Sequence, residues 1–169
     1  FFIPSDDSLG TSWTTTGFID ESWSSGETGI GFDNTPGEFV DLIKTHAKPV
    51  ETVEDGTSIF VRLPFNLDDP SQVKNLTLRM KYDDGFVAYL NGVEVARANL
   101  REDGPQSYNS RARGRSPRAA VEFENHVISQ HIDALQSGQN ILAIHAINSS
   151  ASNSDMFVLP ELVDGLIRN

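Results

Sequence analysis

The chain has 169 residues, no cysteine and a formal net charge of −11. This length suits one domain with its own hydrophobic core, and the lack of cysteine excludes disulfides, zinc–thiolate sites and a cysteine nucleophile. The negative charge argues against a nucleic-acid partner, because phosphate binding needs Lys and Arg. There is also no apolar run near roughly 18 residues, so no membrane span is expected.

Apolar and polar residues alternate along most of the chain, which is the pattern of β-strands. The expected strands, in chain order, are residues 58–67, 73–82, 86–90, 93–98, 119–127, 140–148 and 156–163. Asn91-Gly92 predicts a tight hairpin, because both residues tolerate positive φ. Residues 128–135 are expected to form a short helical turn. The chain therefore predicts an all-β fold, an antiparallel β-sandwich with one short helical turn, as a single domain over residues 1–169.

The order of the expected strands also predicts where the loops lie. Consecutive strands joined by hairpins run antiparallel. If strand 86–90 runs towards the hairpin turn, then residues 83–85, the loop 99–117 and the loop 149–154 all lie at the opposite end. Binding sites on sandwiches are usually built from loops that gather at one end. We therefore expect a ligand-binding surface there.

The loop 99–117, which we call the Arg-rich loop, has an unusual composition. Residues 97–118 contain six arginines, no lysine and two acids, which gives this stretch a net charge of +4. Guanidinium groups form forked hydrogen bonds with carboxylates, sulfates and phosphates, and a tyrosine ring can stack on a sugar. The loop residues expected to bind a ligand are Asn99, Arg101, Tyr108, Asn109, Arg111 and Arg113. The alternative is a solvated, mobile insertion, as is common for long loops.

Four polar residues from other segments are expected at the same end: Asp83, Asp84, Asn148 and Asp155. Their oxygens could bind sugar hydroxyls or a calcium ion. The alternative is that they are turn residues, with Gly85 supplying unusual backbone angles. A catalytic pair of carboxylates, as in glycosidases, is disfavoured for Asp83 and Asp84, because adjacent residues in a strand point to opposite faces. The four histidines show no metal-ligand spacing.

Several of these segments resemble a known family. Residues 83–95, with the sequence DDGFVAYLNGVEV, and residues 135–144, with the sequence LQSGQNILAI, resemble the galactose-binding-domain-like jelly roll. Trp13, residues 18–23 and residues 29–32 are similar to the start of such modules. The fold includes the sugar-binding domain of β-galactosidase-type enzymes and many carbohydrate-binding modules. Trp13 and Trp23 could form a sugar-stacking pair, but their positions in the family imply that they pack the sandwich instead.

The resemblance also implies partners and a location. It is closest to accessory modules of large secreted bacterial proteins. A polysaccharide or oligosaccharide ligand, neighbouring domains of the same polypeptide and a secreted or cell-surface location are therefore expected. Many modules of this fold hold a structural Ca²⁺, so calcium is expected here as well, with its ligands not located. No organic cofactor is expected.

Together these observations predict a non-catalytic carbohydrate-binding module that targets an attached enzyme, such as a polysaccharide hydrolase or lyase, or a surface protein to a polysaccharide. The arginines favour an anionic polysaccharide, either sulfated or uronic. The alternative is a structural or adhesive spacer, which would have a disordered Arg-rich loop and no cleft. A small lyase or esterase is disfavoured, because the sequence has no Gly-x-Ser-x-Gly motif.

Overall fold

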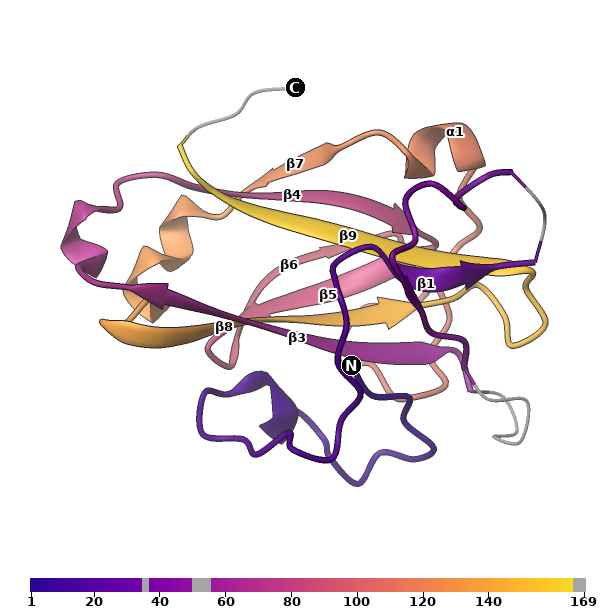
Figure 1. The fold of residues 1–169 in the computed structure, drawn as a ribbon, viewed down its shortest axis with the longest axis horizontal. Coiled ribbons are helices and arrows are strands. Elements are labelled where there is room, and N and C mark those ends of the chain that lie inside the picture. Colours follow the sequence, from indigo (N-terminus) through magenta and orange to yellow (C-terminus); the bar gives the residue numbers. More distant parts are fainter. Residues whose placement is uncertain (35–36, 50–55, 166–169) are drawn as a thin grey trace.

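The computed structural model describes residues 1–34, 37–49 and 56–165, which form two β-sheets packed face to face (Figure 1). One sheet has the strand order β2-β1-β9-β4-β7 and the other β3-β8-β5-β6. The strands are β1 (Ile30–Asp33), β2 (Thr45–His46), β3 (Ser58–Leu67), β4 (Leu76–Asp83), β5 (Gly85–Leu90), β6 (Val93–Ala98), β7 (Glu124–Val127), β8 (Gly138–Ile147) and β9 (Asp155–Asp164). Strands β1 and β2 pair in parallel, and the other pairs are antiparallel. The expected all-β sandwich is confirmed.

Short helices connect the strands. They are η1 (Ser12–Thr14), η2 (Pro70–Gln72), α1 (Pro117–Ala120) and η3 (Ser129–Ala134). Helix η3 confirms the expected helical turn, and the other three were not expected. The hairpin between β5 and β6 is also confirmed, because Asn91 and Gly92 have φ values of 50° and 91°.

Two expected strands begin later than their sequence pattern predicts. Strand β4 begins at Leu76 instead of residue 73, because η2 occupies the residues before it and is capped by the Asp69 carboxylate. The expected strand 119–127 is wrong in its first half, where α1 forms and β7 begins only at Glu124. A proline at the first position of α1 explains this difference, since its fixed φ suits a helix start.

The hydrophobic core lies between the two sheets. Strands β3, β4, β5 and β8 contribute fully buried side chains to it, among them Ile59, Leu78, Phe86 and Ile144. Burial of such side chains from water is the main term that stabilises a sandwich of this kind.

The outer face of the four-stranded sheet is buried as well. The N-terminal segment, residues 1–25, lies beneath β3 in Figure 1 and covers this face. Trp13 is 2% exposed and stacks on Phe60 of β3, with ring centroids 4.2 Å apart. Trp23 is half-buried and stacks on Phe2 at 5.3 Å. The expected packing role of both tryptophans is confirmed.

Arg62 of β3 holds this N-terminal segment on the sheet. Its guanidinium is largely buried and donates hydrogen bonds to the backbone oxygens of Trp13 and Thr15. It also pairs with the Asp20 carboxylate at 2.7 Å. One buried cation therefore satisfies several acceptors of a segment that has little regular structure of its own.

Candidate ligand-binding site

The segments expected to converge at one end do meet there, around Asp84. Its Oδ1 accepts a hydrogen bond from the Arg115 backbone N–H at 2.9 Å. Its Oδ2 accepts from the Ser149 N–H at 2.7 Å and from Asn153 Nδ2 at 3.0 Å. The backbone oxygen of Asp84 accepts from Asn99 Nδ2 at 2.8 Å. Asp84 is only 2% exposed, so its carboxylate joins the loops together and is not open to a ligand.

Residues 83–85 do not form the turn considered as the alternative. Strand β4 ends at Asp83 and β5 begins at Gly85, so the chain passes from one sheet to the other at Asp84, and the Asp83–Asp84 peptide bond is cis. Gly85 is not among the glycines with positive φ. A Cβ at this position would lie 2.8 Å from Ala112 Cβ and 3.0 Å from the Ala98 oxygen. Glycine is therefore needed for the close approach of the Arg-rich loop, and not for unusual backbone angles.

The other polar residues expected here lie in a buried cluster beneath the loops. Asp83 and Asn148 are each 2% exposed. Burial, with Asp84 and Asp155 nearby, raises the pKa of Asp83 to about 8. Burial and the charge of Asp84 also raise the pKa of Asp155. Asn148 Nδ2 donates to the Asp155 backbone oxygen at 3.1 Å. Asp83, Asp84 and Asn148 are thus buried away from a ligand, contrary to the expectation, whereas Asp155 is half-buried.

The described residues show no carboxylate cluster for the calcium ion that the resemblance implied. Within residues 1–34, 37–49 and 56–165, no group of three or more His, Asp or Glu side chains is placed so that it could hold a metal ion. Asp84 has both oxygens engaged by N–H donors.

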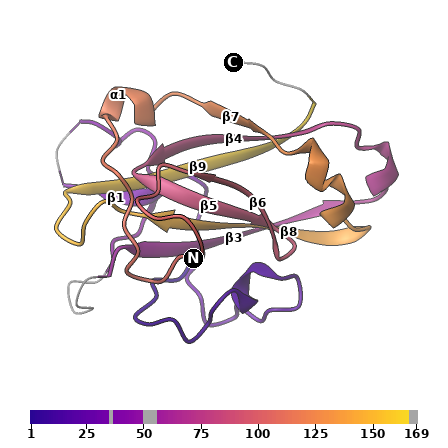
Figure 2. The same cartoon turned by 180° about the vertical axis from the view of Figure 1, so that it is seen from behind.

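The Arg-rich loop is attached to the sheet at several points. Seen from behind, it runs from β6 past the N-terminus to α1 (Figure 2). Leu100 and Ala112 form an antiparallel bridge, and the Ala112 N–H donates to the Asn148 oxygen at 3.0 Å. Ala112 is fully buried and packs in one cluster with Val87 and Ile147. The loop is therefore not the solvated insertion considered as the alternative.

The end of the Arg-rich loop is anchored by Arg115. Its guanidinium lies 3.9 Å above the Tyr82 ring and donates to the Tyr82 hydroxyl at 2.6 Å and to Glu124 Oε2 at 3.0 Å. Burial and the bond to Glu124 raise the pKa of Tyr82, so the hydroxyl stays neutral. This network joins the loop to β4 and β7.

A polar cavity of about 370 Å³ lies within the Arg-rich loop, and we call it the arginine cleft. It is lined by Arg101, Glu102, Gln106, Ser107, Asn109, Ser110 and Arg111. The structure therefore brings three of the predicted site residues, Arg101, Asn109 and Arg111, to one cavity. Arg101 Nε donates to the Ala112 oxygen at 2.8 Å, which fixes the direction of its guanidinium.

Three other predicted loop residues lie outside this cleft. Tyr108 is not among its lining residues, and its backbone oxygen accepts from the Thr57 N–H at 3.3 Å. Asn99 Nδ2 bonds to the backbone oxygens of Asp84 and Arg113. Arg113 is exposed but does not line the cleft either. The expected stacking role of Tyr108 is not supported by this placement.

A second cavity, of about 280 Å³, was missed by the sequence analysis, and we call it the seam cleft. It is lined by Asp6, Asp7, Gly10, Thr11, Trp13, Phe60, Tyr89, Pro105, Gln106, Ser107 and His145. Gln106 and Ser107 line both clefts, so the two adjoin. Trp13 and Tyr89, which lie in segments that carry the family resemblance, were the signals for this cleft.

His145 lies at the seam cleft without forming a catalytic pair. Its Nε2 is 2.8 Å from Ser58 Oγ, and the two residues are 3% and 1% exposed. Burial lowers the pKa of His145 to about 3, so the imidazole is a poor base at neutral pH. The serine hydroxyl is also shielded from solvent. This pair is structural.

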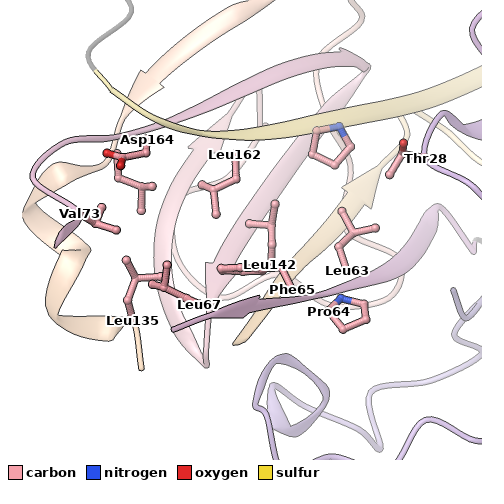
Figure 3. Close-up of a pocket in the computed structure, with 12 residues that line it drawn as sticks. Thr28, Leu63, Pro64, Phe65, Leu67, Val73, Leu135, Leu142, Leu162 and Asp164 are labelled. Atoms are coloured by element: carbon pink, nitrogen blue, oxygen red, sulfur yellow. The ribbon is translucent and has the colours of Figure 1, made fainter. Parts of the chain in front are cut away.

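A third cavity, of about 440 Å³, is apolar and lies between the sheets (Figure 3). It is lined by Thr28, Leu63, Pro64, Phe65, Leu67, Val73, Leu76, Leu135, Leu142, Pro160, Leu162 and Asp164. This apolar groove is open because β1 pairs with β9 only as far as Val158. It offers few hydrogen-bond partners and therefore does not suit a sugar.

Pro160 lies on the uncovered edge of β9 at this groove. The Ser154 oxygen accepts from the Asn34 N–H on the β1 side, and the Gly165 N–H donates to the Asn75 oxygen on the β4 side. Backbone groups of a strand alternate between its two edges. The backbone N–H and C=O groups of the even-numbered residues of β9 therefore point towards the β1 edge. Pro160 is one of these residues, but it lies beyond Val158, the last residue that pairs with β1.

None of the described helices is long and apolar enough to cross a membrane. No protein-family model and no curated protein matches the sequence. Among solved structures, the chain is similar to an α-L-rhamnosidase from Streptomyces avermitilis complexed with L-rhamnose, at 24% identity and a TM-score of 0.42 over 64% of this chain and 9% of that one.

Two further similar structures are glycoside hydrolases. A family 2 member from Bacteroides cellulosilyticus is 13% identical, with a TM-score of 0.47, over 87% of this chain and 18% of that one. A β-glucuronidase from Bacteroides uniformis is 14% identical, with a TM-score of 0.45, over 89% and 16%. The chain thus spans less than a fifth of these three proteins. The structure of the chain itself therefore establishes its fold, which is a β-sandwich of two sheets.

Proposed function

We propose that this domain is a non-catalytic carbohydrate-binding module that holds a larger protein on an anionic polysaccharide. The observation that carries the proposal is the arginine cleft, where two guanidinium groups, amides and hydroxyls line one polar cavity. Forked guanidinium donors suit carboxylates and sulfates, while amide and hydroxyl groups suit sugar hydroxyls. Glu102 lines the same cleft, so its charged side chains sum to +1 with Arg101 and Arg111.

The way the loop is held supports binding over a spacer role. Backbone bonds join Arg101 to Arg111 and Ala112 to Asn148, so the cleft residues are positioned before a ligand arrives. Preorganised groups lose less conformational entropy on binding. A spacer would need neither an attached loop nor a polar cleft. The module would bind modestly, and attachment to other domains would raise the effective concentration at the polysaccharide.

We extend the proposal to the setting of the domain. The family resemblance supports a secreted or cell-surface parent protein, and the small share of the similar glycoside hydrolases that this chain spans is consistent with neighbouring domains. The ligand would be recognised by this domain, and any hydrolysis or elimination would belong to another part of that protein.

Affinity electrophoresis in gels that contain sulfated, uronic or neutral polysaccharides tests the proposal. We expect anionic polysaccharides to retard the wild-type protein, and added salt to reduce the effect, because exposed charge contacts are screened. Arg101→Gln and Arg111→Gln should each weaken binding about tenfold, the loss expected for one charge-assisted contact. Arg118→Gln, at an exposed arginine of α1 outside the cleft, should leave it unchanged. No retardation by any polysaccharide, or equal loss in Arg118→Gln, would overturn the proposal.

A further inference from the structure

The floor of the seam cleft is aromatic and uncharged. Trp13 stacks on Phe60 with 8° between the ring planes, and it meets Tyr89 edge-on with centroids 6.2 Å apart. His145 lies edge-on to Trp13 at 6.5 Å and is neutral because burial lowers its pKa. Trp13, Phe60 and His145 are 2%, 5% and 3% exposed, so the half-buried Tyr89 ring supplies the aromatic surface that is open to the cleft. Such a surface suits the C–H face of a sugar ring that carries no charge.

Two carboxylates of the N-terminal segment stand at the rim of this cleft. Asp6 Oδ1 accepts from the Ser8 N–H at 2.9 Å, and Asp7 Oδ1 accepts from the Tyr108 N–H at 2.8 Å. Hydrogen bonds from Ser8 lower the pKa of Asp6, so it is charged at neutral pH. Fixed carboxylates accept hydrogen bonds from hydroxyl groups, and they repel an acidic group on a ligand.

The two clefts are separated by one short and well-held piece of chain. Gln106 Nε2 donates to the backbone oxygens of Glu102 and Gly104 at 3.2 and 2.9 Å. Ser107 Oγ donates to Asn109 Oδ1 at 2.8 Å. The amide and the hydroxyl therefore stand between the clefts in a fixed arrangement, within reach of a ligand that extends across both.

The sign of the charge changes from one cleft to the other. The arginine cleft has two arginines and one glutamate, a net charge of +1. The seam cleft has two aspartates and no lysine or arginine among its lining residues, a net charge of −2 with His145 neutral. Neighbouring cavities of opposite charge select a ligand whose neighbouring units differ in charge.

Resting on the proposed function, we propose that the two clefts are adjoining subsites for an oligosaccharide in which an uncharged sugar is linked to a uronic or sulfated one. The uncharged sugar packs on the Tyr89 ring, above the buried Trp13, and donates hydroxyl hydrogen bonds to Asp6 and Asp7. Its acidic neighbour lies against the arginines of the other cleft. The difference in charge fixes the direction in which the chain lies across the site.

Titration calorimetry with defined probes tests this inference. The probes are a panel of tetrasaccharides that alternate uronic or sulfated sugars with uncharged ones, an oligogalacturonate of equal length and a neutral cello-oligosaccharide. We expect at least one alternating probe to bind about tenfold more tightly than the oligogalacturonate, as one extra stacked and hydrogen-bonded ring would give. Thr11→Trp, which fills the seam cleft, should remove that advantage and leave oligogalacturonate binding unchanged.

Matched variants separate the two proposals. Ser22→Trp adds the same side chain at an exposed position outside both clefts and should bind like the wild type. Arg111→Gln should weaken the alternating and the uniformly acidic probes alike. Thermal unfolding of each variant shows whether it is folded, and a shift of the Trp13 indole N–H resonance by the alternating probe reports occupancy of the seam cleft in the wild type.

The outcomes distinguish failure of the subsite from failure of the function. If no alternating probe binds more tightly than the oligogalacturonate, the seam subsite is overturned and the proposed function stands. The same conclusion follows if the folded Thr11→Trp and Asp7→Asn proteins both bind the alternating probe with wild-type affinity while Arg111→Gln binds it more weakly. If the wild type binds no probe of either kind, both are overturned.

Discussion

Asp83 is a buried carboxyl group whose ionisation opposes folding. Its Oδ1 has no hydrogen-bond partner in the described part of the chain, and burial beside Asp84 raises its pKa from 3.8 to about 8. A group with a higher pKa in the folded state stabilises that state at low pH and loses this contribution as the pH rises. The free energy of unfolding should therefore fall between roughly pH 4 and 8, by at most about 1.4 kcal/mol per pH unit from this one group.

Asp83→Asn removes the ionisable group and keeps the size of the side chain. We expect the variant to be more stable than the wild type near pH 8, and the difference to shrink towards about pH 5, where Asp83 is protonated. Urea unfolding across this range measures it, and the titration of His145 cancels because both proteins contain it. Asp133→Asn, at an exposed acid, should show no such trend. A difference that is the same at every pH would contradict the assigned pKa.

The sequence predicts correctly which polar residues meet at one end of the sandwich, but it does not predict how far each side chain is buried. The strand directions correctly brought Asp84 to the Arg-rich loop and to residues 149–154. Whether a side chain there faces solvent depends on how closely the loop packs, and this is decided by Ala112 against Gly85. Such a contact between small residues far apart in the chain leaves no periodic pattern in the sequence. The sequence therefore did not show that Asp83 is buried while Arg111 is exposed.

At the scale of elements, the long strands were predictable and the short ones were not. Strand β3 has the expected bounds because ten residues of alternation give a clear period. Strands β1 and β2 have four and two residues, too few for a period to be read. Helix α1 also has only four residues, and its start signal, a proline, was outweighed by the apolar residues that follow.

The position of the Arg-rich loop depends on a glycine in β5. Gly85→Ala places a methyl group 2.8 Å from Ala112 Cβ, so we expect a loss of about 1–3 kcal/mol of stability from overpacking, with weaker polysaccharide binding as the loop moves away. Gly114→Ala is a matched control within the loop, since nothing lies within 4 Å of its Cβ and its φ is not positive. It should change stability by less than about 1 kcal/mol. Equal effects would show that Gly85 does not set the loop position. Chemical denaturation and affinity electrophoresis measure both quantities.

At the scale of the whole molecule, one sheet face is covered by two segments far apart in sequence. The N-terminal segment and the Arg-rich loop meet where the Tyr108 N–H donates to Asp7, across 101 residues. The seam cleft exists only because of this meeting. Local sequence patterns describe neither segment, since both are largely irregular, and this explains why the arginine cleft was foreseen in part and the seam cleft was not.

Arg62 should control the stability of this cover. Arg62→Met leaves the acceptors of the N-terminal segment without their cation, so we expect a loss of about 2 kcal/mol or more. We also expect faster proteolysis within residues 5–25 and weaker binding of the alternating probe. Arg79→Met, which breaks a partly exposed pair with Glu161 on the other sheet, should cost about 1 kcal/mol or less. Intact protection of the N-terminal segment in Arg62→Met would contradict this role.

Pro160 affects how the apolar groove can be filled. An uncovered strand edge beside an apolar opening invites another chain to add a strand, which leads copies to join into fibres. A proline supplies no N–H to such a ladder, so the uncovered edge of β9 lacks the first donor beyond β1. A strand that adds to this edge therefore forms one ladder hydrogen bond fewer at Pro160, which weakens polymerisation through the opening.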